Sequence, residues 1–166
     1  MSEEERAWLA QVPFDAVKYR EEFGVAPCGG EAGCDPRERR GLRPTLEVNG
    51  LRAGYGGPGV KTVIGSDAVA KLTVRLVAAQ DPARTLDLIQ DHLRKHAPAG
   101  LEMKFSDIEA GATALRCNPH ATLLKRAGAD LQQVFGRAPV LNWMGGSIPI
   151  VPDLLRTAGG EGLLIG

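Results

Sequence analysis

Cysteine is scarce in this chain, with only 3 in 166 residues. A small, odd number of cysteines excludes the disulfide framework that holds many small secreted domains together. No apolar run approaches the roughly 20 residues that span a bilayer. The acidic start, Met1-Ser2-Glu3-Glu4-Glu5, is unlike a secretory or mitochondrial targeting sequence. These absences predict a cytoplasmic protein that does not enter a membrane.

An excess of charge of either sign is also missing, because 20 Lys and Arg balance 20 Asp and Glu. A neutral chain gives no electrostatic reason to expect nucleic acid or an anionic membrane as a partner. The apolar fraction of 43% is ordinary, and a chain of this length is expected to bury about 70% of its unfolded surface. Composition therefore predicts one α+β domain and assigns no function.

Helix start signals occur twice in the first 24 residues. Ser2 and Glu5 have the spacing of a capping box, and Asp15 opens a second helix that ends at Gly24. Residues 25–42 are rich in Gly, Pro and charge, which predicts a loop. The segment before residue 44 therefore resembles a connector with too few apolar residues for its own core.

Alternating apolar and polar residues predict three strands, at residues 45–48, 70–77 and 101–106. In the second strand Leu72, Val74 and Leu76 share one face. Lys71, Thr73 and Arg75 share the other, which we expect to face away from the helices, together with Thr62.

Two longer helices follow, starting at Asp81-Pro82 and at Asn118-Pro119, and the second ends at Gly136. A short helix at residues 153–157 and a final strand at 163–165 complete the prediction. The order β-β-α-β-α predicts a ferredoxin-like antiparallel sheet with two helices on one face, lacking its first β-α unit. Because the chain stops inside a predicted strand, we expect it to be part of a larger protein, and we expect the uncovered sheet to self-associate.

Three segments resemble known sites but lack a required part. Residues 54–62 resemble a phosphate-binding loop, yet Val60 separates the last glycine from Lys61, and a strand rather than a helix is predicted to follow. Cys28 and Cys34 have no second ligand pair for zinc. His92 and His96 lie one helical turn apart, but no third ligand is positioned beside them, which favours two solvated histidines.

Arg75 and His120 are more informative. Arg75 lies in mid-strand opposite the apolar face, where a guanidinium either is solvated or grips a carboxylate from a neighbouring domain. His120 lies where a loop enters a helix, which suits a ligand-binding histidine as well as an ordinary surface residue. Residue types alone leave both alternatives open.

Several short motifs in order resemble one enzyme family, the two-zinc metallopeptidases that include carnosine-type dipeptidases, aminoacylases and related carboxypeptidases. The motifs are Arg43-Pro44-Thr45-Leu46, Gly54-Tyr55, Gly59-Val60-Lys61-Thr62-Val63-Ile64, Arg75-Leu76-Val77, Gln80-Asp81-Pro82, Phe135-Gly136 and Gly145-Gly146-Ser147-Ile148-Pro149. The resemblance implies a catalytic domain with two zinc ions and a ferredoxin-like lid that closes over substrate and mediates dimerisation. It divides the chain into a connector (1–43), most of the lid (44–136) and a return into the catalytic domain (137–166).

The resemblance also assigns residues. Thr62, Arg75 and Ser147 fall on the positions that hold a peptide or acyl-amino-acid substrate, and His120 is a weaker candidate. The zinc ligands and the general base of the family have no counterpart in this chain, so it is expected to bind no cofactor and to be inactive alone. The alternative is a free-standing ferredoxin-like binding or dimerisation module without enzymatic activity.

Overall fold

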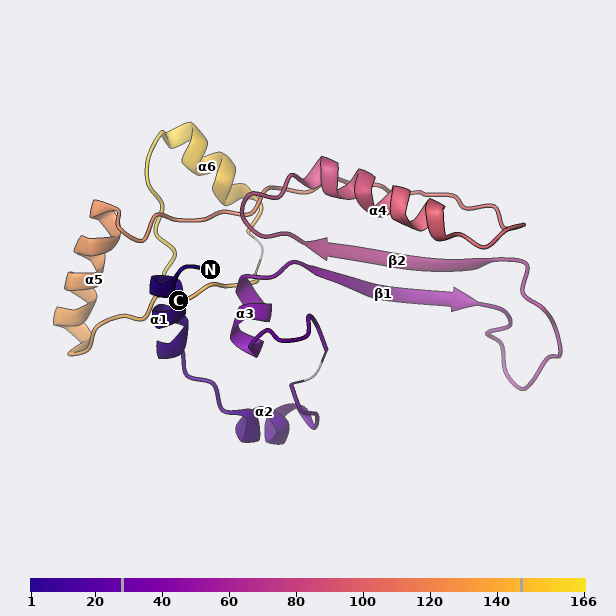
Figure 1. The fold of residues 1–166 in the computed structure, drawn as a ribbon, viewed down its shortest axis with the longest axis horizontal. Coiled ribbons are helices and arrows are strands. Elements are labelled where there is room, and N and C mark those ends of the chain that lie inside the picture. The colour runs from indigo at the N-terminus through magenta and orange to yellow at the C-terminus, as the bar shows by residue number, and fades with distance from the viewer. Residues whose placement is uncertain (28, 147) are drawn as a thin grey trace.

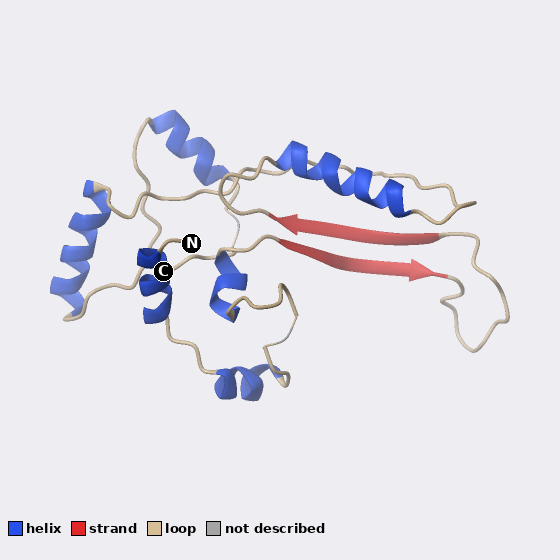
Figure 2. Cartoon of the chain, viewed as in Figure 1, coloured by secondary structure: helices blue, strands red, loops and turns tan. Residues whose placement is uncertain are grey.

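The computed structural model describes residues 1–27, 29–146 and 148–166 of the chain (Figure 1). Helices and two strands are joined by long loops (Figure 2). The elements in chain order are α1 (Glu3–Gln11), α2 (Ala16–Phe23), α3 (Pro36–Gly41), β1 (Thr45–Ala53), β2 (Ala68–Arg75), α4 (Pro82–His96), α5 (Thr122–Phe135) and α6 (Ile150–Ala158). None of these helices combines the length and apolar character needed to cross a membrane, as far as the described residues show.

The capping signals in the sequence correctly predict several helix ends. The Ser2 hydroxyl accepts a hydrogen bond from the Glu5 amide while the Glu5 carboxylate accepts one from the Ser2 amide, which completes the predicted capping box of α1. Asp15 caps α2, and Asp81 caps α4 with proline in the first turn. Gly136 ends α5 in the left-handed conformation, at a φ of 69°. These predictions are confirmed.

Three helices depart from the prediction. α6 begins at Ile150, ahead of the helix expected at residues 153–157. α3 lies inside residues 25–42, which were expected to form only a loop. α5 begins at Thr122, later than Asn118-Pro119 indicates, because Asn118 Oδ1 accepts from the His120 amide and closes a turn ahead of the helix. α5 also lies at the opposite end of the molecule from the sheet, so of the two long helices only α4 runs beside the strands (Figure 1).

The sheet is an antiparallel pair of β1 and β2, which confirms the α+β class. Leu46 pairs with Val74 and Val48 with Leu72, so the apolar residues of both strands share one face. A bulge between Val48 and Gly50 adds one residue, after which Leu51 pairs with Ala70. The bulge returns Leu51 to the apolar face, which is why β1 continues past the point where the alternation stops.

The other two predicted strands are wrong. Residues 101–106 pair with no strand among the described residues, and the Phe105 ring instead lies under the Arg94 guanidinium of α4, 4.9 Å from ring centroid to cation. Residues 163–165 likewise form no strand with any described part of the chain. Alternation of apolar and polar residues indicates that a segment has two different faces. A strand also needs a neighbouring strand for its backbone hydrogen bonds.

Little of the chain is buried. The accessible surface is 13217 Å², whereas a compact protein of this mass exposes about 7,900 Å². The chain thus buries about half of its unfolded surface, and the expectation of about 70% is wrong. Most of both strands is exposed, including Leu46, Val48 and Leu51. An apolar sheet face left open on this scale marks a contact surface.

The tightest packing joins the N-terminal segment to the approach to α5. The buried residues in the described part of the chain are Glu5, Leu9, Val12 and Ala121. Glu5 of α1 forms an ion pair with Arg116, and the Trp8 ring lies 6.1 Å from the Trp143 ring. Residues 1–42 therefore fold against residues 116–145, and the prediction that they are only a connector understates their contacts.

Candidate functional site

Arg75 ends β2 and contacts a distant part of the chain. Its Nη1 atom donates a hydrogen bond to the carbonyl oxygen of Gly145 at 3.1 Å, across 70 residues of sequence. The arginine side chain lies on the face opposite Leu72 and Val74, as the alternation predicts. The hydrogen bond thus brings together the end of β2 and the double-glycine segment. Both belong to the motifs that carry the sequence resemblance.

Ser147 follows this double glycine and lies outside the described residues. Its neighbour Gly145 is half-buried, and Gly146 is exposed. The predicted role of Ser147 in substrate binding therefore stays a prediction.

Thr62 is placed differently from the expectation. It lies in the loop that joins β1 to β2 rather than on the sheet, so the prediction that it shares a sheet face with Arg75 is wrong. The loop leaves β1 after Ala53 and enters β2 at Ala68, whereas Arg75 pairs with Thr45 at the other end of the ladder. An eight-residue strand is about 25 Å long, so Thr62 and Arg75 lie at opposite ends of the ribbon.

His120 belongs to a different neighbourhood, at α1. Its Nε2 lies 3.2 Å from Glu4 Oε2, and its ring lies 5.9 Å from the Trp8 ring. A hollow of about 390 Å³ opens here, lined by Ser2, Glu4, Glu5, Trp8 and residues 116–120. The histidine is thus paired with the N-terminal helix, and the role of His120 in substrate binding stays a prediction.

The weaker sequence candidates remain incomplete in the structure. The loop 54–67 leads into β2 and not into a helix, which agrees with rejecting a phosphate-binding loop. The His92 and His96 rings lie 4.1 Å apart on α4, with His96 Nδ1 2.7 Å from the His92 carbonyl. Cys28, which the sequence placed with Cys34, lies outside the described residues. Elsewhere, burial raises the pKa of the Cys117 thiol.

Metal-ligating side chains do not converge among the residues that the structure describes. Across residues 1–27, 29–146 and 148–166, no three His, Cys, Asp or Glu residues are placed to hold a metal ion. A zinc centre takes three or four protein ligands. The described residues therefore do not fit the zinc site that the resemblance implies, and no step through zinc is derived for them.

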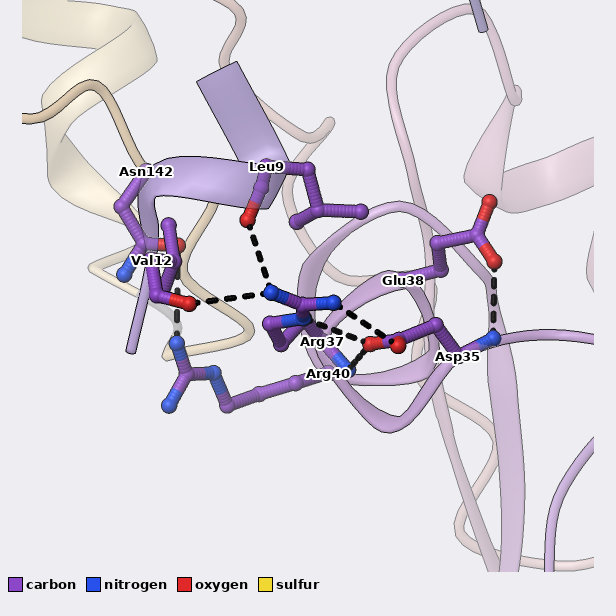
Figure 3. Close-up of polar contacts among 7 residues, drawn as sticks. All are labelled: Leu9, Val12, Asp35, Arg37, Glu38, Arg40 and Asn142. Carbon is purple, nitrogen blue, oxygen red and sulfur yellow. Dashed lines mark hydrogen bonds and ion pairs between the residues drawn. The ribbon is translucent and has the colours of Figure 1, made fainter. Parts of the chain in front are cut away.

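Sequence reasoning missed the cluster of polar contacts around α3 (Figure 3). Arg37 forms a two-pronged contact with Asp35 and also donates to the carbonyls of Leu9 and Val12 at the end of α1. The signal was present, because Asp35, Pro36 and Glu38 have the same cap, proline and capping-box spacing that located other helices.

Comparison with known proteins gives concordant results. The family described as peptidase dimerisation domain matches residues 11–101. The Cys-Gly metallodipeptidase dug1 of Schizosaccharomyces pombe is 24% identical over 147 residues, which are 82% of this chain and 30% of that protein. The Beta-Ala-His dipeptidase of Rattus norvegicus is 24% identical over 156 residues, 90% of this chain and 31% of that protein.

Solved structures show the same fold. The M20 family metallo-carboxypeptidase Sso-CP2 from Sulfolobus solfataricus has a TM-score of 0.72 at 25% identity, covering 95% of this chain and 36% of that one. The dipeptidase Dug1p from Saccharomyces cerevisiae has a TM-score of 0.72 at 22% identity, with 96% and 34% covered. The chain thus spans about a third of the length of the relatives it matches. The family match covers more than half of its residues, and the chain belongs to the M20 peptidase dimerisation domain family.

Proposed function

We propose that this chain is the lid and return segment of a larger zinc-dependent dipeptidase or related amidohydrolase. In this proposal residues 1–43 form a connector, residues 44–136 form the lid, and residues 137–166 re-enter the catalytic domain. Arg75 binds the C-terminal carboxylate of a peptide or acyl-amino acid. The cytoplasmic location expected from the sequence stays a prediction.

The contact of Arg75 with Gly145 carries this proposal. It joins the end of the lid strand to the double glycine of the return segment at 3.1 Å. A guanidinium presents five N–H donors in a planar fork that matches a carboxylate. An arginine held at the junction of lid and return segment is therefore well placed to bind a substrate carboxylate as the lid closes.

Hydrolysis needs parts that the described residues do not supply. In the proposed larger enzyme, two zinc ions would supply the polarisation of the scissile carbonyl and the activation of water, through ligands other than the described residues. The contribution of this chain is binding and orientation. We expect residues 1–166 alone to release no amino acid from a dipeptide and to bind no stoichiometric zinc.

Self-association follows from two features of the sheet. The apolar face formed by Leu46, Val48 and Leu51 is open to solvent, and unpaired strand edges add hydrogen-bonding groups. A dipeptide spans about 7 Å, so Thr62 and Arg75 of one chain do not reach the same substrate across a strand about 25 Å long. If both bind substrate, Thr62 comes from a second copy.

The alternative function is a free-standing dimerisation or binding module. The open sheet supports self-association equally in this case, because it requires no catalytic domain. The coding region beside residues 1–166 discriminates between the two. An in-frame His-x-Asp segment upstream and a histidine near the end of a downstream extension support the enzyme, and the absence of both supports the module.

The direct test uses the longer enzyme and two substrates, a dipeptide with a free carboxylate and its C-terminal amide. Charge-assisted hydrogen bonds contribute about 1.5–3 kcal/mol, so the proposal predicts a preference for the acid of about 10- to 150-fold in kcat/KM. Arg75→Ala abolishes this preference. Lys71→Ala, on the same face of the same strand, is the matched control. An undiminished preference in Arg75→Ala refutes the proposal.

A further inference from the structure

The first turn of helix α3 is hydrogen-bonded to the C-terminal end of α1 (Figure 3). Arg37 Nη1 donates to the Val12 carbonyl at 3.1 Å and to the Leu9 carbonyl at 3.3 Å. Both carbonyls lie at the C-terminal end of α1, where the helix dipole favours a cation, and the Leu9 carbonyl also accepts a hydrogen bond from the Val12 amide. The Arg37 guanidinium of α3 therefore caps the C-terminal end of α1.

The same guanidinium is held in place by Asp35. Arg37 Nε donates to Asp35 Oδ1 at 2.8 Å and Nη2 donates to Oδ2 at 3.0 Å, a bidentate pair. Asp35 is also the cap of α3, since Oδ1 accepts from the Arg37 amide at 2.8 Å. The side chains of Arg37 and Asp35 are 24% and 35% exposed, so this pair is better shielded than an ordinary surface pair.

The other end of α3 lies directly against the return segment. A Cβ atom added to Gly41 would lie 2.5 Å from the Trp143 Cβ and 2.5 Å from the Trp143 carbonyl oxygen. A Cβ atom added to Gly145 would collide with the carbonyl oxygen of Arg40. The two backbones thus approach each other reciprocally, and only glycine at both positions permits this distance.

Gly145 is the residue at which these contacts meet Arg75. Its Cα rests on the end of α3, and its carbonyl accepts the hydrogen bond of Arg75. A side-chain contact beside it, Arg40 Nη2 to Asn142 Oδ1 at 3.4 Å, joins the same two segments (Figure 3). The N-terminal segment is therefore linked to Arg75 through a short series of direct contacts.

We propose that α3 is a brace that positions the Gly145 carbonyl against Arg75, with Arg37 and Gly41 as its positioning residues. Arg37 fixes the start of the brace to α1, and Gly41 lets its end reach the return segment. Neither residue touches substrate. The effect of this brace on substrate binding rests on the function proposed above, whereas the positioning of the Gly145 carbonyl is measurable in this chain alone.

Gly41→Ala is the sharpest perturbation, because helix propensity and steric contact predict opposite signs. Alanine favours a helix over glycine, but the added methyl group would push against the Trp143 backbone. Gly128→Ala in α5 is the matched control, since its Cβ would meet only Pro139 Cγ at an ordinary 3.7 Å. Near-ultraviolet circular dichroism of the Trp8–Trp143 pair, whose ring centroids are 6.1 Å apart, gives a spectroscopic signature.

We expect Gly41→Ala to lose the tryptophan-pair signal and to shift the backbone amide NMR signals of residues 142–146, because the added methyl group displaces this segment. We expect the amide NMR signals of α4 to stay unshifted, which shows that the chain still folds. Gly128→Ala leaves both readouts unchanged. A Gly41→Ala chain with an intact tryptophan-pair signal and unshifted amide NMR signals at residues 142–146 overturns the proposal.

Arg37→Gln keeps the proposal falsifiable if Gly41→Ala fails to fold. It removes the bidentate pair and the contacts with α1, and we expect shifted amide NMR signals at residues 142–146 without loss of α4. Arg156→Gln, which removes an exposed ion pair within α6, is its control. If the amide NMR signals of residues 142–146 shift no more in Arg37→Gln than in Arg156→Gln, the brace is overturned.

The two proposals fail separately. In the longer enzyme we expect Gly41→Ala to reduce the preference for the free carboxylate about tenfold through KM, with kcat for the amide unchanged. If Arg75→Ala leaves that preference intact, the function proposed for Arg75 is refuted, and the amide NMR signals of residues 142–146 still decide the brace. If only Arg75→Ala changes the preference, the brace has no role in substrate binding.

Discussion

Replacing Glu5 with alanine tests the packing of the N-terminal helix most directly. The Glu5 carboxylate accepts from the Ser2 amide at 2.6 Å and forms an ion pair with Arg116, and its side chain is only 9% exposed. The hydrogen bond from the Ser2 amide lowers the pKa of Glu5, burial opposes this, and the nearby Arg116 lowers it further. The carboxylate therefore joins α1 to the segment that precedes α5.

The expected loss is the sum of two contacts. Losing the reciprocal hydrogen bond of a capping box costs about 1 kcal/mol. A charge-assisted contact contributes about 1.5–3 kcal/mol when it is well shielded, and about 1 kcal/mol is the appropriate share here because the Arg116 side chain is 55% exposed. Glu5→Ala should thus lower the free energy of unfolding by about 2 kcal/mol.

Urea denaturation followed by tryptophan fluorescence measures this loss, because Trp8 lies one turn along the same helix. Glu3→Ala is the control. It lies in the same first turn and is exposed, so it should cost at most about 0.5 kcal/mol through the helix dipole. If Glu5→Ala and Glu3→Ala destabilise the chain equally, α1 is not held by Glu5, and the ion pair with Arg116 contributes nothing.

Two further outcomes follow from the charges and from the sheet. The pKa values of Glu5 and Asp35 are both lowered in the folded chain, through the Ser2 amide and through Arg37 respectively. Their stabilisation is therefore present above the ordinary carboxyl pKa of about 4 and is lost as the pH falls below it, so the tryptophan signal should disappear in acid and do so less steeply in Glu5→Gln. Leu72→Lys places a charge on the apolar sheet face and should weaken self-association measured by sedimentation, whereas Lys71→Ala on the opposite face should not; equal association of the two variants would exclude that face as the contact.

The sequence by itself determined where most helices begin and end. Ser2, Asp15 and Asp81 cap helices through hydrogen bonds to amides two or three residues away, and Gly136 ends one through its own backbone conformation. Such contacts are short in sequence, so the pattern contains all of their participants. The apolar face of β2 was equally readable, because alternation is a property of one strand. The motifs around Arg75 and the double glycine located two parts of the candidate site.

Only the tertiary structure decided which segments meet. Residues 101–106 alternate like a strand, yet within the described part of the chain no strand pairs with them, and Phe105 instead lies against Arg94 of α4. The bulge after Val48 depends on the partner strand, and it carries β1 five residues beyond the end of the alternation. Thr62 and Arg75 both matched family positions, but the length of the ribbon separates them. Likewise Gly41 and Gly145 are ordinary glycines in the sequence, and their importance comes from a backbone contact between segments about a hundred residues apart, a distance over which local propensity carries no information.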